Sequence, residues 1–171
     1  MSEKSQFNPT QPVSFGERLA NSQVFADLFR DGMALVEETA TYLDGPGRAE
    51  SKQLARSAAL AYATESMRLT TRLMQLASWL LLHRAVKEGE MTLTQANREK
   101  TKVKLTAADP GPTDTLEKLP AQLQDLIARS MSLQTRVRRL DISIHAPPPE
   151  RNAIGNPRVP QLNRLKAAFE Q

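Results

Sequence analysis

Apolar side chains between residues 116 and 144 recur at alternating spacings of three and four residues, and this repeat constrains the fold more than any other feature. It covers four heptads at the period of 3.5 residues that is typical of helices packed against other helices. Ser130 is its single polar position, and Pro120 stands near the start, where the first turn of a helix tolerates proline. The repeat predicts a long helix, and its positions are Leu116, Leu119, Leu123, Leu126, Ser130, Leu133, Val137, Leu140 and Ile144.

Two further helices are predicted earlier in the chain, over residues 22–43 and 48–87. The first carries an apolar stripe and stops at the sequence DGPGR. There, Gly45 suits a left-handed C-terminal conformation and Pro46 prevents the helix from continuing. Because the break is so short, the two helices should form an antiparallel hairpin.

The second of these helices is the longest and carries two parallel apolar rows. A helix with two adjacent rows must pack against more than one neighbour. One row consists of Leu54, Ala58, Tyr62, Leu69, Leu73, Leu76 and Leu80. The other row consists of Leu60, Ala63, Met67, Met74, Ala77 and Leu81.

Together these patterns predict an all-α fold, an antiparallel three-helix bundle with a long second helix. The bundle domain should span residues 14–145, between a disordered N-terminus at residues 1–13 and a flexible, proline-rich C-terminal tail at residues 146–171. The composition agrees with a helical protein, because aromatic residues make up only 5% of the chain. The first helix is acidic and the second is basic, which suits their packing side by side.

The chain lacks the residue patterns of common catalytic and metal sites. It has no cysteine, which excludes disulfides, thiol catalysis and cysteine-based zinc sites. His83 and His145 are the only histidines, and neither lies in an ExxH or HExxH pattern. No GxSxG motif or glycine-rich phosphate loop occurs. We therefore expect a non-enzymatic protein with no catalytic residue, cofactor, metal or small-molecule substrate.

The run LMQLASWLLLHRA at residues 73–85 contains the only tryptophan and raises the question of membrane insertion. Its apolar part is about ten residues long, whereas a membrane-spanning helix needs about 20. The N-terminus also has no apolar stretch of signal-peptide length. We expect a cytoplasmic protein that does not enter a membrane.

Two groups of residues are candidates for protein recognition. Glu65 interrupts the apolar second helix and is followed by Arg68 and Arg72, so the three form either an ion network within the helix or a polar patch that binds a partner. The second group is either core or the seam of a homodimer built mainly from the second and third helices. Its members are Tyr62, Leu69, Leu73, Leu76, Trp79, Leu80, Leu133 and Val137.

A sequence pI of 9.6 and two dense basic stretches raise nucleic-acid binding as an alternative function. The first stretch contains Arg98, Lys100, Lys102 and Lys104, and the second spans residues 136–139. Such clusters can bind phosphates, but no aromatic residue is interleaved for stacking on bases. A basic helical dimer that binds nucleic acid non-specifically is therefore the second hypothesis, and nucleic acid is the less expected partner.

Two stretches closely resemble the RcdA family, the alphaproteobacterial regulators of CtrA degradation. They are FADLFRDGMALVEETATYLDGPGR at residues 25–48 and AYATESMRLTTRLMQLASWLLLHRAVKEGEMT at residues 61–92. The resemblance covers residues 14–145. It implies a small helical bundle that dimerises and serves, without enzymatic activity, as an adaptor for the ClpXP protease. The implied partners are ClpX and ClpP primed by CpdR, the protein PopA, and cargo such as CtrA.

The same resemblance gives the proline-rich tail a role, because the C-terminal segment in this family is linked to engagement of the protease. A disordered arm with a short apolar motif can raise the local concentration of cargo at a receptor. We expect the apolar residues near the end of the tail to contact the primed protease while the bundle presents cargo. These residues are Val159, Leu162, Leu165 and Phe169.

Overall fold

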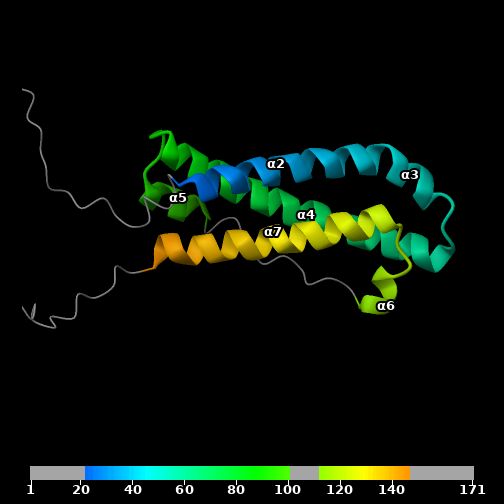
Figure 1. Ribbon diagram of the computed structural model, residues 1–171. Helices are drawn as coiled ribbons and strands as arrows, with labels where there is room; N and C mark the ends of the chain where they lie inside the picture. Colours follow the sequence, from blue (N-terminus) through cyan, green and yellow to red (C-terminus); the bar gives the residue numbers. More distant parts are fainter. Residues whose placement is uncertain (1–21, 101–111, 147–171) are drawn as a thin grey trace, which may run out of the picture.

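The computed structural model describes residues 22–100 and 112–146, and these residues form helices and no strand. Three long helices lie side by side along the molecule, and three short ones lie toward its ends (Figure 1). The long helices are α2 (Gln23–Asp44), α4 (Arg56–Lys87) and α7 (Ala121–His145), and the short helices are α3 (Pro46–Ser51), α5 (Leu93–Lys100) and α6 (Thr113–Leu116). The predicted all-α class is confirmed. The predictions for residues 1–13 and for the tail after Ala146 fall outside the described residues.

The link between α2 and α4 differs from the predicted short break. Gly45 ends α2 with a φ of −113°, so the predicted left-handed conformation is wrong. Pro46 instead starts α3 at once, because a proline suits the first position of a helix. The Tyr42 hydroxyl donates to the Glu50 carboxylate at 2.8 Å, which holds α3 against α2. The long second helix consequently begins at Arg56 and not at residue 48.

Helix α7 runs parallel to α4, whereas the sequence predicted an antiparallel arrangement throughout. Arg72 donates to Ser130, and further along both helices Trp79 donates to Asp141, so contacts advance in the same direction. The cause lies in the connection after α4. Helix α5 lies at the end of the bundle where α4 ends, and α6 lies at the opposite end (Figure 1). Helix α7 therefore begins at the end of the bundle where α4 begins, and α7 is antiparallel only to α2.

The core lies where α2, α4 and α7 meet. Every position of the repeat from Leu119 to Ile144 is buried, although α7 itself begins at Ala121, after Pro120. The row from Ala58 to Leu80 in α4 faces inward, and Leu54, which precedes α4, is partly exposed. Gly32 lets α2 approach α4 closely, because a Cβ atom at this position would lie 2.5 Å from Cδ1 of Leu80.

Candidate functional site

The second apolar row of α4 lies on the surface. We define it as the α4 face, which comprises Leu60, Ala63, Met67, Met74, Ala77 and Leu81. Its four large side chains are spaced seven residues apart, and their exposed fractions are 71% for Leu60, 72% for Met67, 66% for Met74 and 53% for Leu81. A contiguous set of large apolar side chains on a helix surface is a common mark of a protein-binding site.

An apolar groove between α2 and α4 adjoins this face. Val36, Ala40 and Leu43 line it from α2, and Leu73, Met74 and Ala77 line it from α4. Because Met74 and Ala77 belong to both, the groove and the α4 face form one continuous apolar surface. The groove has a volume of about 270 Å³, which is enough for an apolar side chain of a bound protein.

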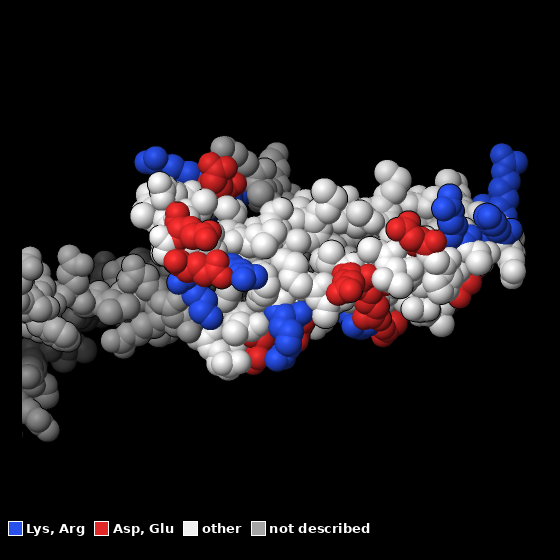
Figure 2. Space-filling model, turned by 90° about the horizontal axis from the view of Figure 1, so that it is seen from above, with Lys and Arg blue, Asp and Glu red and all other residues white. Residues whose placement is uncertain are grey.

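Charged side chains gather elsewhere. Figure 2 looks down on the bundle and shows them at both ends and along one long edge, with an uncharged stretch between. Where α2 meets α7, Arg129 donates to both carboxylate oxygens of Glu38 at 2.7 and 2.8 Å, and Arg136 pairs with Asp31 at 3.2 Å. The hydrogen bond from Arg129 lowers the pKa of Glu38, so this pair stays ionised at neutral pH.

This pairing bears on the nucleic-acid hypothesis. In the first basic stretch Lys100 pairs with Asp141, and in the second Arg136 pairs with Asp31. Cations that share a carboxylate attract phosphates less, because the two charges offset each other. Lys102 and Lys104 lie outside the described residues.

The polar set in α4 is mostly internal. Glu65 and Arg72 are only 2% and 1% exposed, and Arg68 alone reaches the surface. Arg68 donates to Glu65 at 2.6 Å, and Arg72 donates to Ser130 of α7 at 2.9 Å. The single polar position of the α7 repeat is thus a hydrogen-bond partner of α4. A binding protein could reach this set only through Arg68, so we assign the set to the packing of α4 against α7.

We expect Arg72→Ala to lower the free energy of unfolding by about 3 kcal/mol, because it leaves a cavity and removes a donor from a buried hydroxyl. Urea unfolding followed by circular dichroism, at one fixed protein concentration, measures the change. The matched control is Arg84→Ala on the same helix, where the half-exposed side chain pairs with Glu88 and should contribute less than about 1 kcal/mol. Equal midpoints for the two variants would contradict the structural role of Arg72.

The residues predicted as core or dimer seam all lie inside the bundle. They are Tyr62, Leu69, Leu73, Leu76, Trp79, Leu80, Leu133 and Val137. The run of residues 73–85 therefore serves mainly as core, and among the described helices none is both long and apolar enough to cross a bilayer. The tail residues Val159, Leu162, Leu165 and Phe169 lie outside the described residues.

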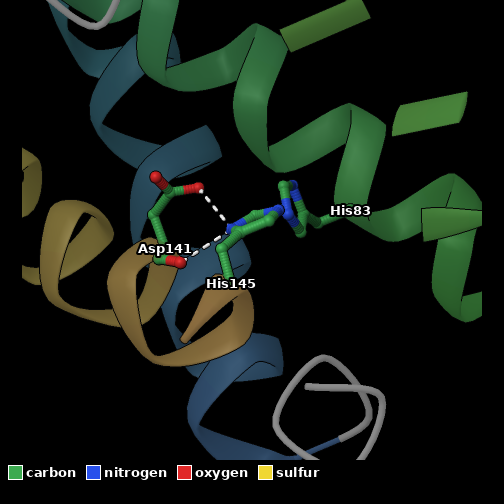
Figure 3. Close-up of side chains that lie close together, drawn as sticks. All are labelled: His83, Asp141 and His145. Atoms are coloured by element: carbon green, nitrogen blue, oxygen red, sulfur yellow. Dashed lines mark hydrogen bonds and ion pairs between the residues drawn. The ribbon is translucent and has the colours of Figure 1, made fainter. Parts of the chain in front are cut away.

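The structure also contains a cluster of two histidines and one aspartate that the sequence did not predict. His83 of α4 meets Asp141 and His145 of α7, and one ligand atom of each lies within 4.8 Å of the others (Figure 3). His83 is far from the other two in sequence, so only the register of α4 against α7 reveals the cluster. The sequence did contain one signal for the cluster, the spacing of Asp141 and His145. Residues four positions apart lie on one face of a helix.

The comparisons with known proteins indicate one family. Residues 16–169 match the family described as "Protein of unknown function (DUF1465)". The crystal structure of RcdA from Caulobacter crescentus CB15 is similar, with 49% sequence identity and a TM-score of 0.61, over 77% of this chain and 99% of that one. No curated protein matches the chain.

Proposed function

This chain belongs to the RcdA family, and we propose that it is a non-enzymatic adaptor that tethers cargo, such as the cell-cycle regulator CtrA, to the ClpXP protease for regulated degradation. Its proposed partners are ClpX and ClpP primed by CpdR, a PopA-like protein and the cargo itself, in the cytoplasm. The observation in this chain that carries the proposal is the exposed α4 face with its adjoining groove. An adaptor works by binding proteins, and this is the kind of surface that such binding uses.

We assign the α4 face to a second copy of the chain, so that the adaptor is a homodimer. Its four large side chains lie symmetrically about the Thr70–Thr71 bond, because Leu60 and Leu81 are equally far from it in sequence, as are Met67 and Met74. If two α4 helices pair antiparallel about a two-fold axis at this point, Leu60 faces Leu81 of the partner and Met67 faces Met74. Around them, Ala63 mirrors Ser78 and Thr64 mirrors Ala77, and all four residues are small. Two-fold interfaces require such self-complementary patches, and a seven-residue spacing keeps them aligned along a helix pair.

This assignment revises the expected dimer seam. The sequence suggested that the second and third helices would share it, but the repeat of α7 is used within the bundle. Among the described helices, only α4 carries a row of exposed large apolar side chains. Ile142, which is 70% exposed, is a large apolar side chain of α7 on the surface.

The groove between α2 and α4 is the proposed contact for cargo, and Ala40→Arg tests it. Ala40 is exposed and lines the groove, so an arginine there places a long charged side chain over the apolar surface. We expect the affinity for fluorescently labelled CtrA, measured by anisotropy, to fall roughly tenfold or more, since blocking one apolar anchor costs about 1.5–3 kcal/mol.

The matched control is Ala34→Arg, an exposed alanine on the same helix that does not line this groove. It should leave the affinity for CtrA unchanged. If neither the parent chain nor the control binds CtrA, the adaptor proposal fails. If both arginine variants bind as well as the parent chain, the groove is not the cargo contact.

The last part of the proposal concerns the C-terminal tail, residues 146–171. We assign Val159, Leu162, Leu165 and Phe169 to contact with the primed protease. The support is the family resemblance together with the spacing of these apolar residues in a proline-rich segment. A tether of this kind converts a weak contact into an effective one by raising local concentration.

A further inference from the structure

The cluster at the end of the bundle has the composition of a metal site. We propose that His83, Asp141 and His145 bind a divalent transition-metal ion of the Zn²⁺ class. Two imidazoles and one carboxylate are a common ligand set for zinc, and they leave a fourth position for water or another ligand. Figure 3 shows His145 between Asp141 and His83, with the three side chains turned toward one another.

His83 gives the strongest evidence, because its ring is fully buried and one of its nitrogens has no partner. The ring stacks on Trp79 with 3.9 Å between ring centroids, and Nδ1 lies 3.0 Å from the Trp79 carbonyl oxygen. A carbonyl only accepts hydrogen bonds, so Nδ1 carries the proton and Nε2 carries a lone pair. Nε2 is buried without a hydrogen-bond partner. A buried acceptor without a partner destabilises the folded protein, and a bound cation removes that penalty.

His145 is held in the same way. Its Nδ1 lies 2.7 Å from the backbone carbonyl oxygen of Asp141, and its Nε2 faces the side-chain amide of Asn97. Metal-binding histidines commonly donate one ring N–H to a carbonyl oxygen or a carboxylate, which orients the other nitrogen toward the ion. His83 already has that arrangement. In His145 the Nδ1 atom also lies 3.3 Å from the Asp141 carboxylate and Nε2 contacts Asn97, so the Asn97 side chain has to turn away before Nε2 binds an ion.

Two ligands of a tetrahedral zinc ion lie about 3.4 Å apart at bond lengths of about 2.1 Å. Atoms within 4.8 Å of one another reach that spacing through small side-chain rotations.

Lys100 is the competitor of the ion. Its ammonium donates to the Asp141 carboxylate at 2.6 Å, and so supplies the positive charge that a cation would bring. Trp79 holds the same carboxylate through its indole N–H at 2.8 Å. Lys100 is the last residue of α5 and its side chain is 24% exposed. The Lys100 side chain can therefore turn toward solvent when an ion binds to the Asp141 carboxylate.

The test is titration of the tag-free full-length chain with Co²⁺ followed by visible absorption, and with Zn²⁺ followed by calorimetry. We expect one ion per chain and the intense absorption of tetrahedral Co²⁺. His83→Phe and His145→Gln should each weaken binding roughly tenfold or more. Lys100→Met should tighten it, because it removes the competing charge. The control is Glu88→Gln, which changes an exposed carboxylate at the C-terminal end of α4. It should leave the affinity for the ion unchanged.

Each remaining outcome overturns the proposal. These are no saturable binding by the natural chain, equal binding by the parent and both histidine variants, and binding by Lys100→Met alone. The last result would show that the lysine occupies the site permanently. Because His145→Gln changes a partly exposed residue, it keeps the test valid even if His83→Phe fails to fold.

Discussion

A chain truncated after Ala146 is expected to keep its fold and to lose all stimulation of cargo degradation. The described helices α2, α4 and α7 share an apolar core, and we expect this bundle to keep its packing when residues 147–171 are removed. The proposed contact with the primed protease lies in the removed part. Circular dichroism checks the fold, and the degradation rate of CtrA by ClpXP, CpdR and a PopA-like protein checks the function.

A full-length variant separates the effect of the apolar residues from that of tail length. In it the four apolar tail residues, Val159, Leu162, Leu165 and Phe169, are replaced by serine. This variant, like the truncated chain, should not stimulate degradation of cargo. Without its apolar anchors the tail no longer binds the protease, so it cannot raise the local concentration of cargo there. Normal delivery of cargo by the truncated chain would show that the tail has no part in engagement of the protease.

The combined variant Met67→Lys and Met74→Lys should be monomeric. Antiparallel pairing buries four methionine side chains per dimer at these positions, and each contributes about 1.5 kcal/mol or more. Their loss weakens the dimer by about 6 kcal/mol, or about four powers of ten in Kd. The lysines would also face each other across the two-fold axis, which adds repulsion between like charges. Sedimentation velocity at micromolar concentration measures the result.

The matched control is Ile142→Lys, which changes a side chain of similar exposure on α7. It should leave the dimer intact. Dissociation of this control would place α7 in the interface, and a dimeric Met67→Lys, Met74→Lys variant would exclude the α4 face.

Because the natural chain has no cysteine, introduced cysteines can also test whether the two α4 helices of the dimer run antiparallel. Antiparallel pairing predicts disulfides between Met67→Cys and Met74→Cys chains when the two are mixed.

The sequence predicted the helices well because each buries a stripe that repeats with helical period. The α7 repeat shows this most clearly, since its positions from Leu119 to Ile144 are buried as expected. The two rows of α4 were also visible. Periodicity does not say which of two equivalent rows faces inward, so the exposure of Leu60, Met67, Met74 and Leu81 needed the structure.

Other features depend on how helices are placed against each other. The polar position Ser130 was evident in the repeat, but its partner Arg72 depends on α7 running parallel to α4. The same register brings His83 to His145. A chain direction set by the long connection after α4 cannot be derived from helix periodicity, and neither can the clusters that follow from it.

The most direct test of the adaptor proposal is reconstituted degradation of purified CtrA by ClpX, ClpP, CpdR and a PopA-like protein, with and without this chain. We predict that adding the chain shortens the lifetime of CtrA roughly tenfold or more, since tethering raises its effective concentration at the protease. The acceleration should disappear when either CpdR or ATP is left out. An unchanged CtrA lifetime in the complete mixture, with a folded chain and an active protease, would contradict the account.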